Sequence, residues 1–378
     1  MFHVKHCLRA HSRAPLIGAL ALLVLLAAGC ATDLGSPDGW AAPVEAEGLV
    51  LVQPERGEFT AIQLGEGPAR IAWRFPEDAA LPAGVDRDDL DDLEAFYATP
   101  VVDGGVVYLA AFSGQALAVD VSGDGPRVVW LRDLPERVVG TPVLHGGILY
   151  VPTEGGELLP VNAETGATGA TIAAGSERFW ARPEVGGAAI YVAGLDRRVR
   201  AVDRDGGELW TLALDGAVAG DLLLDGETLY VGALDRRMYA LDVLADGAER
   251  WRFDGDAWFW ARPLIDGDTL YASTTNGSVY ALDARSGNEL WQFREVDGEI
   301  RAQPVLAGGV LVVALREGVL FGLDPSTGVR QWQETLAEGA LLGDPLVLES
   351  AILYVTDRGD LISVDPRSGT ASVVFEGN

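Results

Sequence analysis

Hydrophobic and polar residues alternate in short runs along most of this chain, and the runs recur at a nearly constant spacing. The clearest copies are LYVGALDRRMYALD from Leu229, LYASTTNGSVYALD from Leu270 and LYVTDRGDLISVD from Leu353. Alternation with a period of two residues is typical of β-strands, whose side chains point to opposite faces in turn. We therefore expect short strands, and no segment with sustained helical periodicity.

Weaker copies extend the repeat over about residues 40 to 375. They begin at Val107, Leu149, Ile190 and Leu311, and the most degenerate copy begins at Leu49. A leading residue, usually proline, precedes each unit: Pro43, Pro100, Pro142, Pro183, Asp221, Pro263, Pro304 and Pro345. The spacings between them are mostly 38 to 42 residues, and the first is 57 because of an acidic insertion at about 76–98. The chain therefore contains eight units.

The turn chemistry supports hairpins within each unit. An Asp or Asn precedes a Gly by four residues in several units, as in Asp283 with Gly287, Asp324 with Gly328, and Asp365 with Gly369. The carboxylate can accept main-chain N–H groups two residues on, and Gly adopts positive φ without strain. This spacing predicts a bulged hairpin loop.

Four short strands in each of eight units predict an all-β fold, an eight-bladed β-propeller of four-stranded antiparallel blades, with seven blades as the alternative. Six tryptophans fall at equivalent positions on the expected fourth strands: Trp73, Trp130, Trp210, Trp251, Trp291 and Trp332. We expect each indole to dock between adjacent sheets. The third and the last unit lack this tryptophan, so their junctions should be weaker.

The N-terminal segment predicts export. An uncharged apolar run covers residues 16–28 after a basic stretch, and it ends in LLAAGC, which resembles a bacterial lipobox. We expect a lipoprotein signal peptide at 1–29, lipidation of Cys30, a tether at 30–39 and the propeller at 40–378. The alternative is an ordinary signal peptide with an incidental cysteine.

Charge and composition restrict the function classes. The formal net charge is -28, which argues against a nucleic-acid partner and against electrostatic adsorption to an anionic bilayer. Removal of the signal peptide leaves one cysteine and one histidine, His145, so neither a disulfide framework nor a cysteine metal site is expected. The acidic insertion lacks the spacing of an EF-hand loop, and we expect a solvated loop or short helix there.

The pattern LYALD-x-x-(Thr/Ser)-Gly-x-x-x-Trp resembles the tryptophan-docking repeat of pyrroloquinoline-quinone-type propellers. An eight-unit lipoprotein of this size is similar to the BamB-like propeller lipoproteins of the outer-membrane β-barrel assembly machinery. That resemblance implies a non-catalytic, lipid-anchored scaffold that binds proteins at the cell envelope, needs no cofactor, and is a monomeric subunit of a larger complex. The location would be an outer membrane, or else the outer face of the cell membrane. The alternatives are a ligand- or polymer-sensing propeller and a quinone-dependent dehydrogenase.

The resemblance also places two segments of every unit on one face: the linker before the leading residue and the turn between the second and third strands. The pentapeptide FWARP occurs in two linkers, at 179–183 and 259–263, and LDRR occurs in two turns, at 195–198 and 234–237. Arginine and tryptophan are enriched in binding hot spots. The predicted partner-binding residues are Trp180, Arg182, Arg197, Arg198, Arg236, Arg237, Trp260, Arg262, Arg301, Arg316 and Arg358. The alternative is that each arginine pairs with a nearby acid, such as Asp196 or Asp235, and that the tryptophans pack between blades.

Overall fold

The computed structural model describes residues 39–378, apart from 55–56, 66, 295–297, 337–338 and 378. The predicted signal peptide, Cys30 and the tether up to residue 38 lie outside the described residues. Asp38–Asn378 form one compact unit. In the described part of the chain, no helix has the length and apolar content needed to cross a membrane.

The first four sheets, numbered as blades in chain order, have these strands. Blade 1 comprises β1 (Val44–Ala46), β2 (Leu49–Val52), β3 (Phe59–Gln63) and β4 (Arg70–Phe75). Blade 2 comprises β5 (Val101–Asp103), β6 (Val106–Ala110), β7 (Gln115–Asp120) and β8 (Arg127–Asp133). Blade 3 comprises β9 (Val143–His145), β10 (Ile148–Pro152), β11 (Glu157–Asn162) and β12 (Ala173–Ala174). Blade 4 comprises β13 (Glu184–Gly186), β14 (Ala189–Ala193), β15 (Arg198–Asp203) and β16 (Glu208–Ala213).

The other four blades repeat this plan. Blade 5 comprises β17 (Leu223–Asp225), β18 (Thr228–Gly232), β19 (Arg237–Asp242) and β20 (Ala248–Asp254). Blade 6 comprises β21 (Leu264–Asp266), β22 (Thr269–Ser273), β23 (Val279–Asp283) and β24 (Glu289–Phe293). Blade 7 comprises β25 (Val305–Ala307), β26 (Val310–Ala314), β27 (Val319–Leu323) and β28 (Arg330–Thr335). Blade 8 comprises β29 (Leu346–Val347), β30 (Ile352–Val355), β31 (Leu361–Val364) and β32 (Ala371–Phe375).

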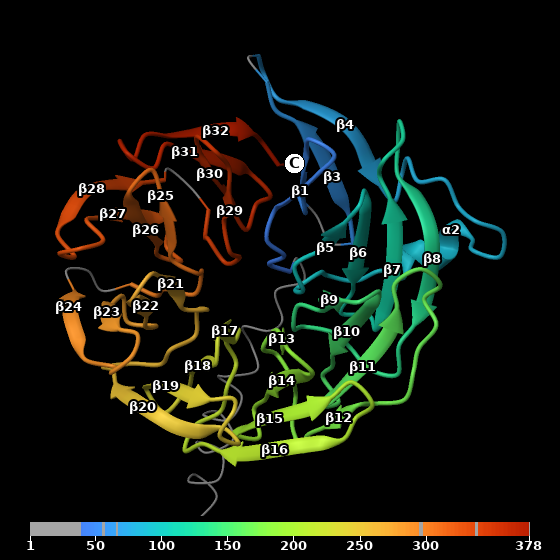
Figure 1. Cartoon of the computed structure of the whole chain (residues 1–378). Helices are drawn as coiled ribbons and strands as arrows, with labels where there is room; N and C mark the ends of the chain where they lie inside the picture. The colour runs from blue at the N-terminus through green and yellow to red at the C-terminus, as the bar shows by residue number, and fades with distance from the viewer. Residues whose placement is uncertain (1–38, 55–56, 66, 295–297, 337–338, 378) are drawn as a thin grey trace, which may run out of the picture. The chain divides into compact units, whose positions relative to one another are not determined.

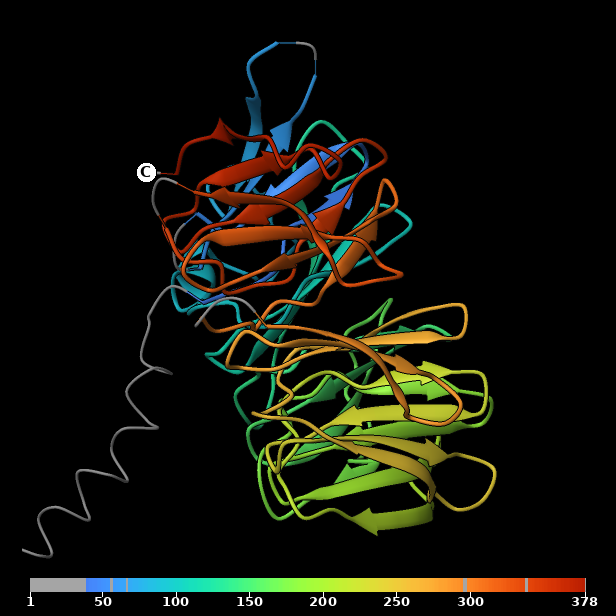
Figure 2. The same ribbon diagram turned by 90° about the vertical axis from the view of Figure 1, so that its left-hand side faces the viewer.

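The eight sheets form a closed ring, which confirms the eight-bladed propeller and excludes the seven-bladed alternative. Each sheet is built from four consecutive strands, with the first strand toward the centre and the fourth at the rim (Figure 1). Blades 1 and 8 lie side by side in both views (Figures 1 and 2). They share a core that includes Val50, Ile62, Leu353 and Leu361. In the described residues, ring closure thus depends on side-chain packing and not on strand exchange.

In blades 5 and 8, the structure shifts the alignment of the repeat units by one residue. Strand β13 begins directly after Pro183, whereas β17 begins directly after Leu222. Leu222 is therefore the leading residue of blade 5, and Asp221 is equivalent to Arg182. In blade 8 Leu353 faces Ser363, the pairing that Tyr271 makes with Ala281 in blade 6. Tyr354 consequently packs against blade 7, on the other side of its sheet.

Four of the six recurring indoles donate one hydrogen bond to the next blade. Trp130 and Trp251 are buried, and Trp291 and Trp332 are partly buried. Their Nε1 groups donate to main-chain oxygens of the following blade: Trp130 to Ala163 (2.8 Å), Trp251 to Ala284 (2.9 Å), Trp291 to Pro325 (3.0 Å) and Trp332 to Pro366 (2.9 Å). A buried indole N–H without a partner would be costly, so these carbonyls stabilise the docked position.

At five blade junctions the glycine of the hairpin loop lies directly against the indole of the preceding blade. A Cβ atom at Gly287 would be 2.6 Å from Cδ2 of Trp251, and Gly287 also has a φ of 71°. Gly166, Gly247, Gly328 and Gly369 meet Trp130, Trp210, Trp291 and Trp332 in the same way. Two separate constraints therefore favour glycine at this position: the positive φ and the indole ring packed against it.

Blade junctions without this arrangement are packed differently. In blade 3, Gly206 of the next blade lies against Ile172, which occupies the site of the missing indole. Trp73 is buried, but its Nε1 has no hydrogen-bond partner among the described residues. No glycine of the neighbouring turn covers it, since Gly123 and Gly125 have open space around them.

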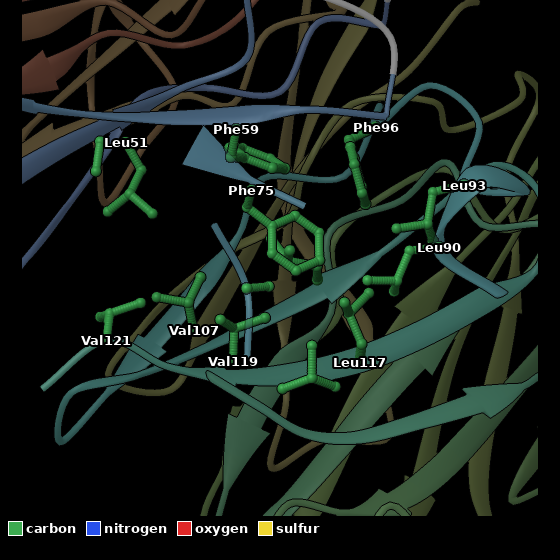
Figure 3. Packing of buried hydrophobic residues seen from close by; sticks show 14 of the residues in the cluster. Leu51, Phe59, Phe75, Leu90, Leu93, Phe96, Val107, Leu117, Val119 and Val121 are labelled. Carbon is green, nitrogen blue, oxygen red and sulfur yellow. The ribbon is translucent and has the colours of Figure 1, made fainter. Parts of the chain in front are cut away.

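The acidic insertion reinforces the junction of blades 1 and 2. Its short helix α2 (Arg87–Asp91) exposes the carboxylates but buries Leu90, and Leu93 and Phe96 follow in the same core (Figure 3). The rings of Phe96 and Phe59 lie 4.8 Å apart. The expected short helix with exposed carboxylates is present. The sequence did not predict that the apolar positions of the insertion fill space in the core that the repeat leaves unfilled.

Around the central channel, the linkers are joined by main-chain N–H groups that donate to the side chain of the next linker. Thr99 N–H donates to Thr141 Oγ1 at 3.1 Å, and Gln303 N–H donates to Asp344 Oδ1 at 2.6 Å. Although part of Asp344 faces a cavity, burial raises the pKa of its carboxyl to about 6, and the charge of Asp221 adds to the effect. The ring thus contains a carboxyl group whose pKa is raised well above the ordinary value of aspartate.

The Gly287→Ala substitution tests the indole contact. We expect the variant to lose about 2–4 kcal/mol of unfolding free energy, because a strained φ and an overpacked ring add together. Gly267→Ala in the same blade is the matched control: its φ is 57° and nothing lies within 4 Å of a Cβ there. It should lose only about 1 kcal/mol. Urea unfolding measures both, and equal losses would contradict the packing role.

The Asp344→Asn substitution tests the channel carboxyl. The raised pKa means that the unfolded chain releases this proton first as the pH rises from about 4 to 6, so the wild type loses stability over that range. Asparagine keeps the acceptor for Gln303 N–H. We expect the variant to exceed the wild type by about 1–3 kcal/mol at pH 7.5 and to match it below pH 4, in urea unfolding at each pH. A pH-independent difference would argue against this assignment.

Candidate functional site

One face of the ring carries both the linkers and the turns between second and third strands. Main-chain hydrogen bonds join the two segments: Leu195 N–H to Arg178 O at 3.0 Å, Leu234 N–H to Ala217 O at 2.8 Å, and Thr275 N–H to Trp258 O at 2.9 Å. The side chains of different blades that these segments carry therefore occupy one surface, with the channel at its centre.

The two FWARP segments belong to blades 4 and 6 and meet each other across blade 5. The aromatic rings of Trp180 and Trp260 lie 6.3 Å apart. Arg262 Nη2 donates to Glu184 Oε1 at 2.8 Å, and its Nε donates to Leu222 O at 2.9 Å. Arg262 thus links three blades, and its guanidinium is paired.

The phenylalanine of FWARP is an anchor. Phe179 and Phe259 are fully buried, and the same linker position is apolar and buried in blades 2, 3, 5, 7 and 8. Gly194 lies against the ring of Phe179 and Gly232 against Cβ of Phe259, at distances that leave no room for a Cβ atom. The repeated pentapeptide is therefore largely a packing unit.

A cavity of about 90 Å³ opens at the channel mouth between the linkers. Aromatic residues of several blades line it, together with Asp221 and Asp344. Arg182 N–H donates to Asp221 Oδ1 at 2.8 Å, and burial raises the pKa of Asp221. Arg301 also lines the cavity, where its Cζ lies 5.2 Å from the ring centroid of Trp260.

Further from the channel, two arginines adopt a backbone conformation that favours glycine. Arg197 and Arg236 have φ values of 63° and 71° in the turns of the adjacent blades 4 and 5. In the other six blades this turn position is glycine: Gly57, Gly114, Gly156, Gly277, Gly318 and Gly359, all with positive φ. Arg197, Arg198 and Arg236 are exposed, and none has an ion pair among the described residues. We call these three residues the arginine rim.

Most of the other predicted binding arginines are paired with acids or lie elsewhere. Arg182 has no ion pair among the described residues, and its buried Nε has no hydrogen-bond partner there. Arg237 contacts Asp215 at 2.5 Å and Asp254 at 2.9 Å. Arg301 and Arg316 both pair with Glu299, at 2.8 Å and 3.3 Å.

Arg358 lines a separate groove of about 620 Å³ between blades 7 and 8. Asp196 pairs with Arg200 and not with either rim arginine of its own turn. The arginines therefore do not form one continuous cluster.

Sequence reasoning did not identify the two channel carboxylates as site residues. Asp344 and Asp221 were not among the predicted residues, although both occupy the linker position of Arg182 and Arg262, which an alignment of the units would have revealed. Trp258 is 47% exposed beside the turn of blade 6. In the described ranges, no group of three or more His, Cys, Asp or Glu residues is arranged to hold a metal ion.

Solved structures with a similar fold include BamB from Moraxella catarrhalis, at a TM-score of 0.68 and 19% identity over 87% of this chain and 94% of that one. A computationally designed protein, Ika8, gives a TM-score of 0.71 at 13% identity, over 86% of this chain and 96% of its own.

Among curated proteins, outer membrane protein assembly factor BamB of Alkalilimnicola ehrlichii is 34% identical over 97 residues, which cover 26% of this chain and 23% of the relative. BamB of Salmonella typhimurium is 32% identical over 96 residues, 25% of this chain and 22% of the relative. The chain thus matches less than a quarter of the length of these relatives. The family model described as outer membrane protein assembly factor BamB matches residues 39–171 and 195–372, well over half of the sequence. This chain therefore belongs to the BamB family of outer membrane protein assembly factors.

Proposed function

We propose that this protein is a non-catalytic scaffold of outer-membrane protein assembly, tethered by a lipid on Cys30, that captures an acidic segment of a protein partner on the arginine rim. Family membership and the BamB relatives support the process. The observation that carries the binding surface is the pair of exposed, unpaired arginines at positive φ in neighbouring blades.

The backbone conformation of Arg197 and Arg236 destabilises the folded state, and no ion pair of these side chains compensates for it. A non-glycine residue in the left-handed region costs about 1 kcal/mol or more, and such residues cluster at functional sites. Neither Arg197 nor Arg236 makes an ion pair in the described structure that would offset this cost. The chain also has twice as many acidic as basic residues, 56 against 28, so free arginines on one face are a local exception.

The guanidinium groups of the arginine rim indicate the chemical class of the partner. Guanidinium groups bind carboxylates through paired, charge-assisted hydrogen bonds, so an acidic loop or strand is the complementary surface. Trp258 provides an exposed aromatic side chain on the same face, in blade 6. The interaction we propose is therefore electrostatic at blades 4 and 5, with an aromatic contact beside it.

A catalytic role has little chemical support in the described residues. His145 Nε2 lies 2.8 Å from Nη2 of Arg204, between hairpin turns, and it does not line the channel cavity. The polar groups in the cavity are carboxylates, threonines and paired guanidinium groups, without an adjacent nucleophile and base. A scaffold is the function that this arrangement supports best.

Replacing Arg197, Arg198 and Arg236 together by Ala tests the rim. We expect capture of the partner to fall at least tenfold, because the three exposed arginines without an ion pair in the described turns are removed. Pull-down from detergent-solubilised outer membranes, with quantitative mass spectrometry, measures the loss. The channel arginines are left intact, since removal of Arg262 would strand Glu184.

The matched control removes Arg204, Arg285 and Arg367, which carry the same charge on the hairpin turns at the other end of the strands. Its partner capture should stay within twofold of wild type. Equal losses in both variants would mean that net charge alone causes the effect. Unchanged capture in the rim variant would exclude the arginine rim as the binding surface.

The Arg197→Gly/Arg236→Gly double substitution separates stability from binding. Glycine removes the left-handed strain, so we expect the unfolding free energy to rise by about 1–2 kcal/mol while partner capture falls. Urea unfolding and the same pull-down measure the two quantities. A loss of stability would mean that these arginines hold the turns together, contrary to the binding role.

A further inference from the structure

The cavity at the channel mouth contains charged groups that the proposed function does not use. Asp221 and Asp344 line it, and each has one hydrogen bond, from the N–H of Arg182 and of Gln303. Arg182 and Arg262 act on both carboxylates, Glu184 acts on Asp221, and Asp221 acts on Asp344. When all three acids are ionised, they face two guanidinium groups, which leaves an excess of one negative charge in a poorly solvated site.

The guanidinium groups cannot neutralise this excess. Arg182 supplies one charge for two channel carboxylates, and its buried Nε has no hydrogen-bond partner among the described residues. Arg262 already donates to Glu184 and to Leu222 O. Arg301 is paired with Glu299. A buried charge without a partner is costly, so this cluster has an unmet requirement for one cation.

The remaining lining is aromatic. Trp180, Trp260, Tyr97 and Trp40 border the same cavity. The faces of such rings attract cations, with Trp the strongest. Trp260 already shows this property, since the guanidinium of Arg301 lies over its ring. Carboxylates combined with aromatic faces are the arrangement that recognises organic ammonium groups.

From this geometry we propose that the cavity binds a single organic ammonium group, with the cation between Asp221 and Asp344 and its alkyl part against Trp180 and Trp260. The volume, about 90 Å³, is roughly that of three water molecules in the liquid, which suits a primary alkylammonium. The absence of a group of three metal-ligating side chains in the described residues is consistent with this class of ligand. The site lies apart from the arginine rim and goes beyond the scaffold role, so either can fail without the other.

Isothermal titration of the full-length protein in detergent tests the site, with n-butylammonium as the probe. Neutral n-butanol and potassium are compared at the same sodium concentration. We expect saturable binding of butylammonium, no saturable binding of butanol, and potassium binding at least tenfold weaker. Equal binding of potassium would assign a simple monovalent-ion site and overturn the proposal, as would the absence of saturable butylammonium binding.

Three variants locate the binding. Asp344→Asn and Asp221→Asn keep the acceptor oxygens but remove one charge each, and each should weaken butylammonium binding at least tenfold. Asp205→Asn removes the same charge from an exposed turn residue and should stay within twofold. Thermal unfolding confirms that each variant is folded, and the second channel variant decides the outcome if the first does not fold. Unchanged affinity in a folded channel variant would exclude this cavity.

Discussion

The contact between the indole of one blade and the hairpin loop of the next is the interaction on which the ring depends. It joins a hydrogen bond, as from Trp251 Nε1 to Ala284 O, to the burial of a ring face against Gly287. Burial of an indole contributes about 2–3 kcal/mol, and the carbonyl prevents the cost of an unpaired N–H. Because this contact connects neighbouring sheets, repeating it positions most blades relative to the next.

Departures from this contact occur where other residues take over its role. Ile172 fills the site beneath Gly206 in the third blade, and the insertion supplies Leu90 and Phe96 beside Trp73. The variable elements lie on the face where linkers and turns meet. A rigid ring can present unlike side chains there, such as the rim arginines, because the strands beneath do not depend on them.

Much of the fold follows from the sequence because the repeat couples distant positions chemically. The tryptophan of one unit and the glycine of the next, such as Trp251 and Gly287, recur at a fixed spacing because the indole leaves no room for a Cβ atom. This recurrence made the strands and the number of blades predictable. Alternation alone did not fix the register of blade 8. There Tyr354 stands one residue after the position that tyrosine occupies in other units. The site was less predictable, since pairing partners such as Glu184 for Arg262 are 78 residues away. The positive φ of Arg197 could have been found by aligning the turns and noting the glycines of other blades.

Hydrogen exchange of the tryptophan indole N–H groups, followed by ¹H–¹⁵N NMR, tests the central contact most directly. The account predicts that Trp130, Trp251, Trp291 and Trp332 exchange together and only as slowly as the whole ring opens, while exposed Trp258 exchanges at the rate of a free indole. Rapid, independent exchange at the four docked positions would contradict it.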